Sequence, residues 1–336
     1  MLQSKNNITI KVSAPARLHL GFLDLHGGLG RLFGSLGIGL NEIYTELDVR
    51  SSTEPEYIGE SALRAQEYAE RMLAHLNIRS SVRLQVHKAI PEHAGLGSGT
   101  QMALAVGTAI SKLFDAGLSL SDIARILDRG NRSGIGIGAF EKGGFIVDAG
   151  RSATTEVPPV VSQLYFPDSW RFVLVLDKKR KGVHGQEEKK AFGTLAKMDE
   201  SLSADLCRLL VMQILPAIAE QDCELFGSAV TTIQTSMGEY FKSIQSGIYT
   251  SAEVGEVLTR LQEMGASGVG QSSWGPTGFA IYASETDAYH ALKETRSNWP
   301  SDSNLELMIC KAHNEPASII TKKNNYDNPE ALLEQG

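Results

Sequence analysis

A glycine-rich loop between a strand pattern and a helix pattern constrains this chain more than any other feature. The loop spans residues 91–101, Pro-Glu-His-Ala-Gly-Leu-Gly-Ser-Gly-Thr-Gln. Before it, Val82, Leu84 and Val86 alternate with polar residues, which predicts a half-buried strand, and after it the apolar run 102–114 predicts a helix. Glycines let the backbone approach a ligand closely, and the N-terminus of a helix attracts negative charge. The arrangement therefore predicts an anion site and favours a phosphate.

Glycines also occur in tight turns and helix caps for purely local reasons, so the loop by itself leaves that interpretation open. The loop does not match the Gly-x-x-x-x-Gly-Lys-Ser/Thr pattern of P-loop nucleotide triphosphatases. It also lacks the well-placed acidic partner of the dinucleotide-binding fingerprint. Phosphate binding is thus favoured over nicotinamide binding.

The bulk composition is that of an ordinary globular protein. With 336 residues, 42% hydrophobic and 21% charged, the chain is long enough for two cores, so two domains are expected. A net charge of −7 argues against a nucleic-acid partner. No run approaches the apolar length of a membrane span and no signal-peptide pattern begins the chain, so a cytoplasmic protein without a membrane partner is expected. The three cysteines lack metal-ligand spacing and are interpreted as buried reduced thiols: Cys207, Cys223 and Cys310.

Periodic patterns place the remaining elements. Strand patterns cover 8–12, 18–22, 145–148, 171–176, 278–283 and 305–310. Helical patterns cover 60–76, 120–129, much of 186–236, and 251–264. Residues 154–167 are rich in Pro, Ser and Thr and have no clear period, so a domain boundary is expected there. We expect an N-terminal domain at 1–155, a C-terminal domain at 165–322, a disordered tail at 323–336, and an α+β fold.

The strand pattern at 18–22 also orients two polar side chains. Leu18, Leu20 and Phe22 alternate with Arg17 and His19. Because side chains alternate across a strand, Arg17 and His19 are expected to point to the same face.

The glycine loop resembles a known family signature. Its order, Pro-x-x-x-Gly-Leu-Gly-Ser-Gly-Thr, resembles the second signature of the GHMP superfamily, named for galacto-, homoserine, mevalonate and phosphomevalonate kinases. Further segments resemble the β-ribofuranosylaminobenzene 5′-phosphate synthase family within it: 16–25, 131–136 with 140–148, 182–188, and 268–277. The resemblance extends from about residue 10 to about residue 315.

The resemblance implies both a fold and a reaction. The fold would be a two-domain GHMP-kinase-like α+β fold, with an N-terminal domain like domain 2 of ribosomal protein S5 and a ferredoxin-like C-terminal domain. The reaction would join 5-phosphoribosyl 1-diphosphate to 4-aminobenzoate, or a close para-substituted benzoate, releasing carbon dioxide and diphosphate on the route to tetrahydromethanopterin. Mg²⁺ and a homodimer are implied as well.

The loop would hold the departing diphosphate in this reaction. Its backbone N–H groups and hydroxyls are the expected contacts: Gly95, Leu96, Gly97, Ser98, Gly99 and Thr100. Mg²⁺ would share the negative charge, with Glu187 and Glu188 as candidate metal contacts. The two glutamates could instead stabilise the exposed start of a helix.

Several basic residues lie in the matched segments. The candidate catalytic residues among them are Arg17, His19 and His184, and the candidates for substrate binding are Arg31 and Arg132. The 5-phosphate and the benzoate carboxylate would suit Arg17, His19 and Arg132. Each arginine could instead form a surface ion pair. His184 could protonate the ring or bind phosphate, or could be merely structural or exposed. The basic run 178–181 is either a solvated loop or a guide for anionic substrates.

Two aspartates occur in the same segments. Asp24 is a candidate catalytic residue, and Asp148 ends a strand pattern. Neither has to be catalytic, because an amino-activated arene needs no strong base before attack and aspartates are common at turns.

The third signature departs from that of the kinases. Gln271, Ser272, Ser273 and Trp274 replace its glycine-rich sequence and are expected to contact substrate. Trp274 offers a flat surface for an aryl ring or packs at the domain seam.

Two other functions remain open from the sequence. One is an ATP-dependent small-molecule kinase with the same loop and Mg²⁺. The other is a relative that binds ligand without turnover. The synthase needs no ATP, whereas the kinase requires it, and the binding protein would only be stabilised by its ligand.

Overall fold

The structure is a computed structural model that describes residues 8–180, 182, 190, 192–245, 247–300 and 303–324. Most of its first half, joined by the C-terminal strand β11, forms a seven-stranded sheet in the order β11-β1-β2-β4-β3, with β5 pairing β2 and β6 pairing β5. The strands are β1 (Ile8–Asp24), β2 (Phe33–Ser52), β3 (Glu56–Gly59), β4 (Ser81–Lys88), β5 (Phe145–Asp148), β6 (Val160–Leu164) and β11 (Ser318–Lys323).

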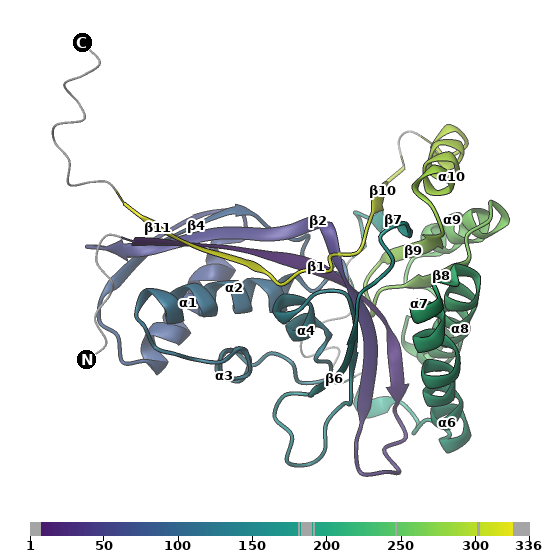
Figure 1. The fold of residues 1–336 in the computed structure, drawn as a ribbon, viewed down its shortest axis with the longest axis horizontal. Coiled ribbons are helices and arrows are strands. Elements are labelled where there is room, and N and C mark those ends of the chain that lie inside the picture. The colour runs from purple at the N-terminus through teal and green to yellow at the C-terminus, as the bar shows by residue number, and fades with distance from the viewer. Residues whose placement is uncertain are drawn as a thin grey trace.

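Four helices cover one face of this sheet, as Figure 1 shows. They are α1 (Ala62–His75), α2 (Ser98–Leu113), α3 (Leu120–Ile126) and α4 (Ile135–Glu141). The central helix α2 is buried along most of its length because it lies between the sheet and α1, α3 and α4. Its N-terminus is therefore held rigidly at one end of the sheet.

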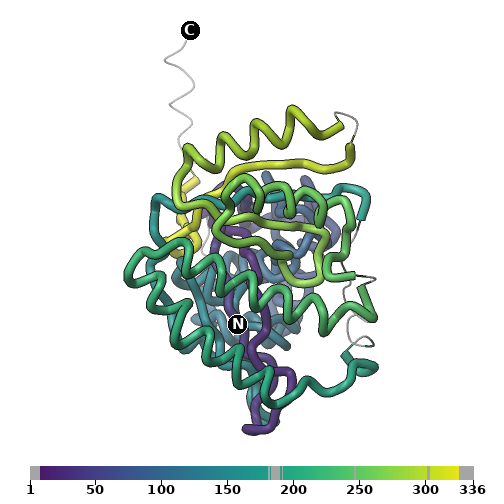
Figure 2. Tube along the Cα trace, turned by 90° about the vertical axis from the view of Figure 1, so that its right-hand side faces the viewer, coloured from purple at the N-terminus to yellow at the C-terminus, as the bar shows by residue number. Residues whose placement is uncertain are grey.

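The second half is a four-stranded antiparallel sheet in the order β10-β7-β9-β8. Its strands are β7 (Arg171–Asp177), β8 (Gly268–Gln271), β9 (Thr277–Tyr282) and β10 (Leu305–Cys310). Helices α8 (Cys223–Gln245), α9 (Ala252–Glu263) and α10 (Glu285–Ser297) pack on this sheet. Helix α6 (Glu200–Leu209), the π-helical turn η1 (Leu210–Ile214) and α7 (Leu215–Glu220) pack instead against β1 and α8 (Figure 2). The α+β fold expected from the sequence is confirmed.

Strands β1 and β2 extend from the first half onto the helices of the second. One hydrophobic cluster contains Leu18 and Leu36 of these strands together with Phe226 and Ile233 of α8. The side-chain amide of Gln234 donates to the Leu20 carbonyl at 2.8 Å. The two halves thus share a core, and the expected division at 1–155 and 165–322 stays a prediction.

Several elements differ from the sequence expectation. The strands expected at 8–12 and 18–22 are one 17-residue strand, whose alternation is interrupted by irregular register at Pro15/Ala16 and at His19/Gly21. The glycine-dense segment 27–39 contains the start of β2, where a Cβ on Gly37 would lie 2.5 Å from the Leu18 carbonyl oxygen. Glycine is needed there for close packing. The glycine-rich composition therefore resembled that of a loop, although the segment forms a strand.

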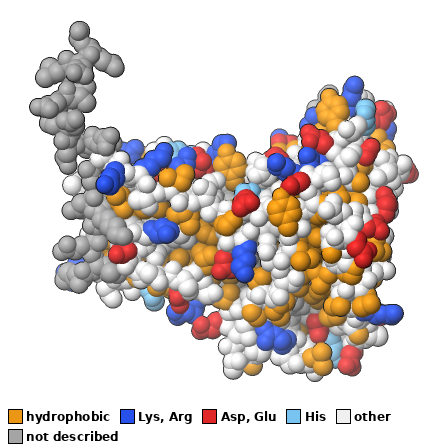
Figure 3. Space-filling view, in the orientation of Figure 1, with side chains coloured by type: hydrophobic (Ala, Val, Ile, Leu, Met, Phe, Trp, Pro, Cys, Tyr) orange, Lys and Arg blue, Asp and Glu red, His pale blue; other side chains and the backbone are white. Residues whose placement is uncertain are grey.

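One helical stretch departs from the expectation that no run approaches the length of a membrane span. Residues Glu200–Glu220 meet that test by length and composition. The stretch buries Leu206 and Ile214 against the core, whereas Val211 and Met212 are exposed. On the face seen in Figure 3, hydrophobic side chains are scattered among charged side chains of both signs. One such helix is weak evidence for a membrane span, because core helices pass the same test.

Candidate functional site

The glycine loop closes around the side chain of Arg17. The backbone N–H of Arg17 donates to the Leu96 carbonyl at 3.1 Å, and its guanidinium donates to the Gly95 carbonyl. Gly97 caps α2 with a φ of 83°, and a Cβ there would lie 3.1 Å from Cγ of Arg17. Because α2 begins at Ser98, the first N–H groups of a buried helix face the same space as this guanidinium.

A turn from the second half forms the facing wall. The Ser272 hydroxyl donates to the Gly95 carbonyl at 2.7 Å and accepts from the His19 N–H at 3.0 Å. The Ser273 N–H donates to the His19 carbonyl at 3.3 Å. A Cβ on Gly95 would lie 2.3 Å from the Ser272 carbonyl oxygen, so the approach of the turn requires glycine. The structure therefore brings together the segments around 17–19, 95–97 and 271–274.

These walls enclose a cavity of about 410 Å³, which we call the glycine-loop cavity. Its lining includes the predicted Gly95, Gly97, Ser98, Gly99, Thr100, Ser273 and Trp274. Three guanidinium groups line it as well, those of Arg17, Arg64 and Arg129. Three cations beside a helix N-terminus are suited to a multiply charged anion such as a diphosphate.

Arg64 and Arg129 were not identified from the sequence. Arg64 pairs with Glu92 at 3.0 Å. Arg129 lies over the ring of Tyr68, hydrogen-bonds its hydroxyl, and has a buried Nε without a partner in the described part of the chain. An arginine directly before Gly130, at the end of the predicted helix 120–129, was the only sequence signal for it.

His19 is almost completely buried, with 3% of its surface exposed. Burial, and then the nearby charge of Arg17, lower the pKa of its imidazole to about 3. The ring is therefore neutral at pH 7, and its Nε2 has no hydrogen-bond partner among the described residues. It stands edge-on to Phe22 at 4.6 Å. Such a group can form a hydrogen bond with a substrate but does not act as a cation.

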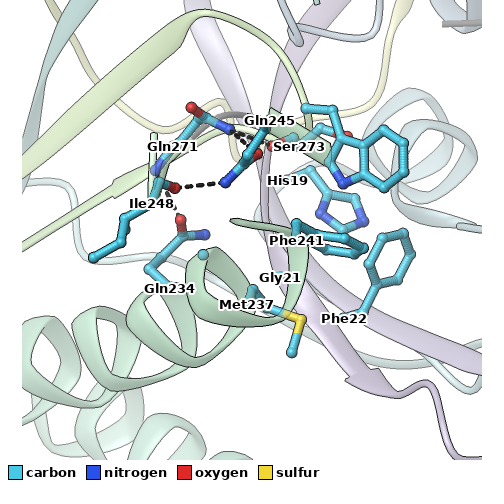
Figure 4. Close-up of a pocket in the computed structure, with 12 residues that line it drawn as sticks. His19, Gly21, Phe22, Gln234, Met237, Phe241, Gln245, Ile248, Gln271 and Ser273 are labelled. Atoms are coloured by element: carbon cyan, nitrogen blue, oxygen red, sulfur yellow. Dashed lines mark hydrogen bonds between the residues drawn. The ribbon is translucent and has the colours of Figure 1, made fainter. Parts of the chain in front are cut away.

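His19 and Trp274 line a small chamber of about 30 Å³, hereafter the chamber (Figure 4). Figure 4 shows the rings of His19, Phe22 and Phe241 close together, with a hydrogen-bonded set of glutamines beside them. Gln271 belongs to this set: its side-chain NH₂ donates to the Ser273 carbonyl at 3.0 Å. The Nε1 of Trp274 is also buried without a partner in the described chain. A space of this size holds about one water, hydroxyl or amino group and not a whole ring.

Trp274 lies between the chamber and the glycine-loop cavity and also contacts Phe192. It lines both the chamber and the glycine-loop cavity. Phe192 stacks on it with ring centroids 4.8 Å apart and an interplanar angle of 18°. Trp274 thus packs at the seam and also lines a cavity, and its contact with an aryl ring stays a prediction.

Arg31 and Arg132 lie apart from the glycine-loop cavity. With Arg151 they line a second cavity of about 670 Å³, which we call the arginine cavity. The guanidinium of Arg132 lies 5.1 Å from the centre of the Phe192 ring. Two basic residues that the sequence assigned to substrate binding are therefore placed together, and Arg151 joins them.

The two aspartates make the contacts of turn and scaffold residues. Asp24 accepts from the N–H groups of His26 and Gly27, both at 2.8 Å. Asp148 is fully buried and accepts from the N–H groups of Gly134 at 2.9 Å and Gly150 at 2.8 Å. Burial raises the pKa of the Asp148 carboxyl, whereas these hydrogen bonds oppose the rise. A catalytic role for Asp24 stays a prediction.

His184, Glu187 and Glu188 lie outside the described residues. Within the described ranges, no three His, Cys, Asp or Glu side chains are grouped so that they could hold a metal ion. The glycine-loop cavity does offer hard oxygen donors, namely the hydroxyls of Ser98 and Thr100 and the carboxylate of Glu67. Such donors suit Mg²⁺, which usually keeps several waters and binds substrate phosphates.

Comparison with known proteins identifies the family. Residues 61–144 match the GHMP kinases N terminal domain and residues 214–301 match the GHMP kinases C terminal family. The β-ribofuranosylphenol 5′-phosphate synthase of Methanothermobacter thermautotrophicus is 32% identical over 296 residues, which cover 82% of this chain and 89% of that protein. The protein of the same name from Archaeoglobus fulgidus is 33% identical over 285 residues, which cover 81% and 87%.

A solved structure of similar fold is the mevalonate kinase of L. major. It is 16% identical, superposes with a TM-score of 0.67, and is matched over 93% of this chain and 99% of that chain. At this identity the likeness concerns the fold alone. Together with the relatives of higher identity, it confirms the resemblance found in the sequence: the chain belongs to the β-ribofuranosylphenol 5′-phosphate synthase family, a family of enzymes built on GHMP kinase domains.

Proposed function

We propose that this enzyme transfers the phosphoribosyl group of 5-phosphoribosyl 1-diphosphate to a para-substituted benzoate, forming a C-riboside with release of carbon dioxide and diphosphate. The observation that carries the proposal is the glycine-loop cavity, which Arg17, Arg64 and Arg129 line together with the first residues of α2. A leaving diphosphate needs this kind of preorganised positive potential, because its charge develops as the C1–oxygen bond breaks.

The reaction is balanced by its two leaving groups. Diphosphate departs with the electron pair of the C1–oxygen bond, which leaves an oxocarbenium-like ribose. The ring carbon that carries the carboxylate then bonds to C1, and the carboxylate leaves as carbon dioxide and returns its bonding pair to the ring. No net proton is exchanged, so the protein has to bind, orient and stabilise charge more than it has to transfer protons.

The acceptor we propose is 4-hydroxybenzoate. The sequence resemblance implied 4-aminobenzoate, but the relatives are named for a ribofuranosylphenol product. A phenol ring is what remains when 4-hydroxybenzoate loses its carboxylate. A hydroxyl group has the size of the chamber, where Nε2 of His19 and Nε1 of Trp274 lack partners among the described atoms. We therefore propose that the para substituent points into the chamber from the Trp274 side of the glycine-loop cavity.

Mg²⁺ belongs to the proposal. Ser98, Thr100 and Glu67 are the described oxygen donors at the glycine-loop cavity, and Glu187 and Glu188 remain candidates. When bound, the ion would neutralise part of the diphosphate charge. A cytoplasmic homodimer that supplies tetrahydromethanopterin biosynthesis is the wider setting we propose, and light scattering of the purified protein tests the dimer.

Product analysis tests the function. The enzyme with Mg²⁺ is incubated with 5-phosphoribosyl 1-diphosphate and either 4-hydroxybenzoate or 4-aminobenzoate, with and without ATP. We expect an ATP-independent C-riboside 5′-phosphate, identified by mass spectrometry and by the C1 carbon signal in NMR. Formation of a phosphorylated alcohol only when ATP is present would replace the synthase with the kinase alternative.

A further inference from the structure

The arginine cavity lies where three separate segments meet. Arg31 comes from the connection between β1 and β2, Arg132 from the segment that precedes α4, and Arg151 from the turn after β5. None of the three lines the glycine-loop cavity. The chain thus builds a second basic site distinct from the one around Arg17.

Two of these guanidinium groups are anchored by neutral carbonyls. Nε and Nη2 of Arg31 donate to the carbonyls of Ala149 at 2.7 Å and Gly150 at 2.8 Å. Nη1 of Arg151 donates to the Asn131 carbonyl at 2.9 Å. Within the described part of the chain, no carboxylate forms an ion pair with either guanidinium group.

One carboxylate does line the arginine cavity. Asp128 is exposed, and its Oδ1 already accepts from Nδ2 of Asn131 at 2.8 Å. Among the described residues that line the cavity, three guanidinium groups face one exposed carboxylate, which gives an excess of positive charge. It is therefore suited to an oxyanion.

Asp148 holds the arginine cavity in shape from behind. One carboxylate oxygen accepts from the Gly150 N–H at 2.8 Å, next to Arg151. The other accepts from the Gly134 N–H at 2.9 Å and from the Ser133 hydroxyl at 3.3 Å, next to Arg132. A Cβ on Gly150 would lie 2.1 Å from the Leu32 carbonyl oxygen, so the turn is closely packed. The site is built into the fold and is not a chance meeting of surface side chains.

We propose that the arginine cavity binds the phosphate monoester end of a sugar phosphate, which is the 5-phosphate of the ribosyl donor if the proposed function holds. Phe192 lies between Arg132, 5.1 Å from its ring centre, and Trp274, whose ring is stacked on it at 4.8 Å. Trp274 in turn lines the glycine-loop cavity. Two basic cavities on either side of one aromatic pair match a donor that carries a diphosphate at one end and a phosphate at the other.

The chemistry favours phosphate over the carboxylate of the acceptor. That carboxylate must lose its charge and leave as carbon dioxide. Guanidinium groups would stabilise the charged ground state more than the transition state and so slow the step. The 5-phosphate keeps its charge throughout the reaction, so binding it costs nothing in the chemical step. A dianion also uses several guanidinium groups, whereas one bidentate arginine suffices for a carboxylate.

Binding of ribose 5-phosphate tests the proposal independently of turnover. Calorimetry is performed on the wild type and on Arg151→Gln and Arg31→Gln, with Arg83→Gln as a matched control because Arg83 pairs with Glu56 at 3.3 Å on the far strands. We expect Arg151→Gln and Arg31→Gln each to weaken binding about tenfold or more, in line with the loss of a charged hydrogen bond. The control should bind like the wild type. Arg151 makes a single anchoring bond, so its variant remains informative if Arg31→Gln fails to fold.

Steady-state kinetics separate the possible occupants. We expect Arg151→Gln to raise KM for 5-phosphoribosyl 1-diphosphate, with KM for the benzoate and inhibition by inorganic diphosphate unchanged. Unchanged ribose 5-phosphate binding in both variants, or a rise in KM for the benzoate alone, would overturn the assignment. Ribose 5-phosphate binding that depends on these arginines, in an enzyme that forms no C-riboside, would defeat the proposed function and leave the phosphate site standing.

Discussion

Arg17 is the residue on which the glycine-loop cavity depends most. It holds the loop through the carbonyls of Gly95 and Leu96 and presents its guanidinium beside the start of α2. We expect Arg17→Ala to lower kcat/KM by about 30- to 1000-fold, because loss of a charge that pairs with a substrate anion costs roughly 2 to 4 kcal/mol. Initial rates against Arg83→Ala as control measure this. A change smaller than threefold would remove Arg17 from the site.

The burial of His19 leads to a prediction about the free energy of unfolding and not about the reaction rate. Its folded pKa of about 3 lies below the ordinary value of 6.5, so only the unfolded chain takes up its proton between these limits. The stability due to neutral His19 is complete above pH 6.5 and is lost progressively as the pH falls toward 3, because the unfolded chain binds the proton and the folded chain does not. Urea unfolding at pH 7 and pH 5 should show this loss in the wild type and less of it in His19→Gln.

A control separates this effect from general acid destabilisation. The exposed His290 lies on α10, far along the chain from the chamber. His290→Gln should lose stability between pH 7 and pH 5 as the wild type does. If His19→Gln followed the same pH dependence as the wild type and His290→Gln, the imidazole would not be held neutral in the folded protein.

Single residues show what alternation can and cannot predict. It predicted one common face for Arg17 and His19. The structure places Arg17 at the glycine-loop cavity and His19 at the chamber, and Ser273 and Trp274 line both spaces. The difference between these two spaces, about 410 Å³ and about 30 Å³ in volume, depends on helix α8 and the turn at 271–274, which are distant in sequence from β1. The sequence did not identify Arg129 and Arg151 for the same reason. A single arginine beside a glycine can be assigned to a binding site only when the residues around it in space are known.

At the scale of elements, the glycine loop has to accommodate the turn from the second half. Gly95 has a φ of 80°, and a Cβ on it would meet the Ser272 carbonyl oxygen at 2.3 Å. Gly265 has a φ of 86° with nothing within 4 Å of such a Cβ. Gly265→Ala should therefore cost only the backbone strain of about 1 to 2 kcal/mol. Gly95→Ala should cost more stability and should also abolish measurable turnover.

Thermal unfolding and activity of these two variants show whether stability and turnover depend on the close contact between Gly95 and the turn at 271–274. Equal destabilisation of Gly95→Ala and Gly265→Ala, with activity retained in both, would show that the loop does not need the turn. Comparison at matched φ removes the effect of left-handed backbone strain, which both variants share.

Element prediction succeeded where the periodicity was strong and uninterrupted. The helices at α1 and α2 and the strands β4, β7 and β10 lie where the patterns placed them. It failed where packing overrides composition: α4 contains Gly136 and Gly138, which let it approach Thr100 and Ile146 closely, so its sequence looks like a loop. Strand β11 is short and mostly exposed, and only its pairing with β1 identifies it.

For the whole molecule, the fold class and family followed from ordered sequence blocks, whereas the way the halves join did not. The long strands β1 and β2 belong to the first sheet yet contribute to the core beneath α8. That arrangement places the glycine loop, the chamber and the turn at 271–274 at a single seam. No local pattern in the sequence encodes such a seam, because it depends on contacts between residues more than 200 positions apart, such as Gln234 with Leu20.

The proposed decarboxylating transfer of the phosphoribosyl group can be tested directly on the intact enzyme. Transfer to a ring carbon that bears a carboxylate must release carbon dioxide and diphosphate together, since neither product can form without the other. The most direct measurement uses 4-hydroxybenzoate labelled in its carboxyl carbon and counts both products in one reaction. We predict equal amounts of labelled carbon dioxide and diphosphate, dependent on 5-phosphoribosyl 1-diphosphate and unaffected by omission of ATP. Diphosphate release without labelled carbon dioxide, or no release of either product, would contradict the account.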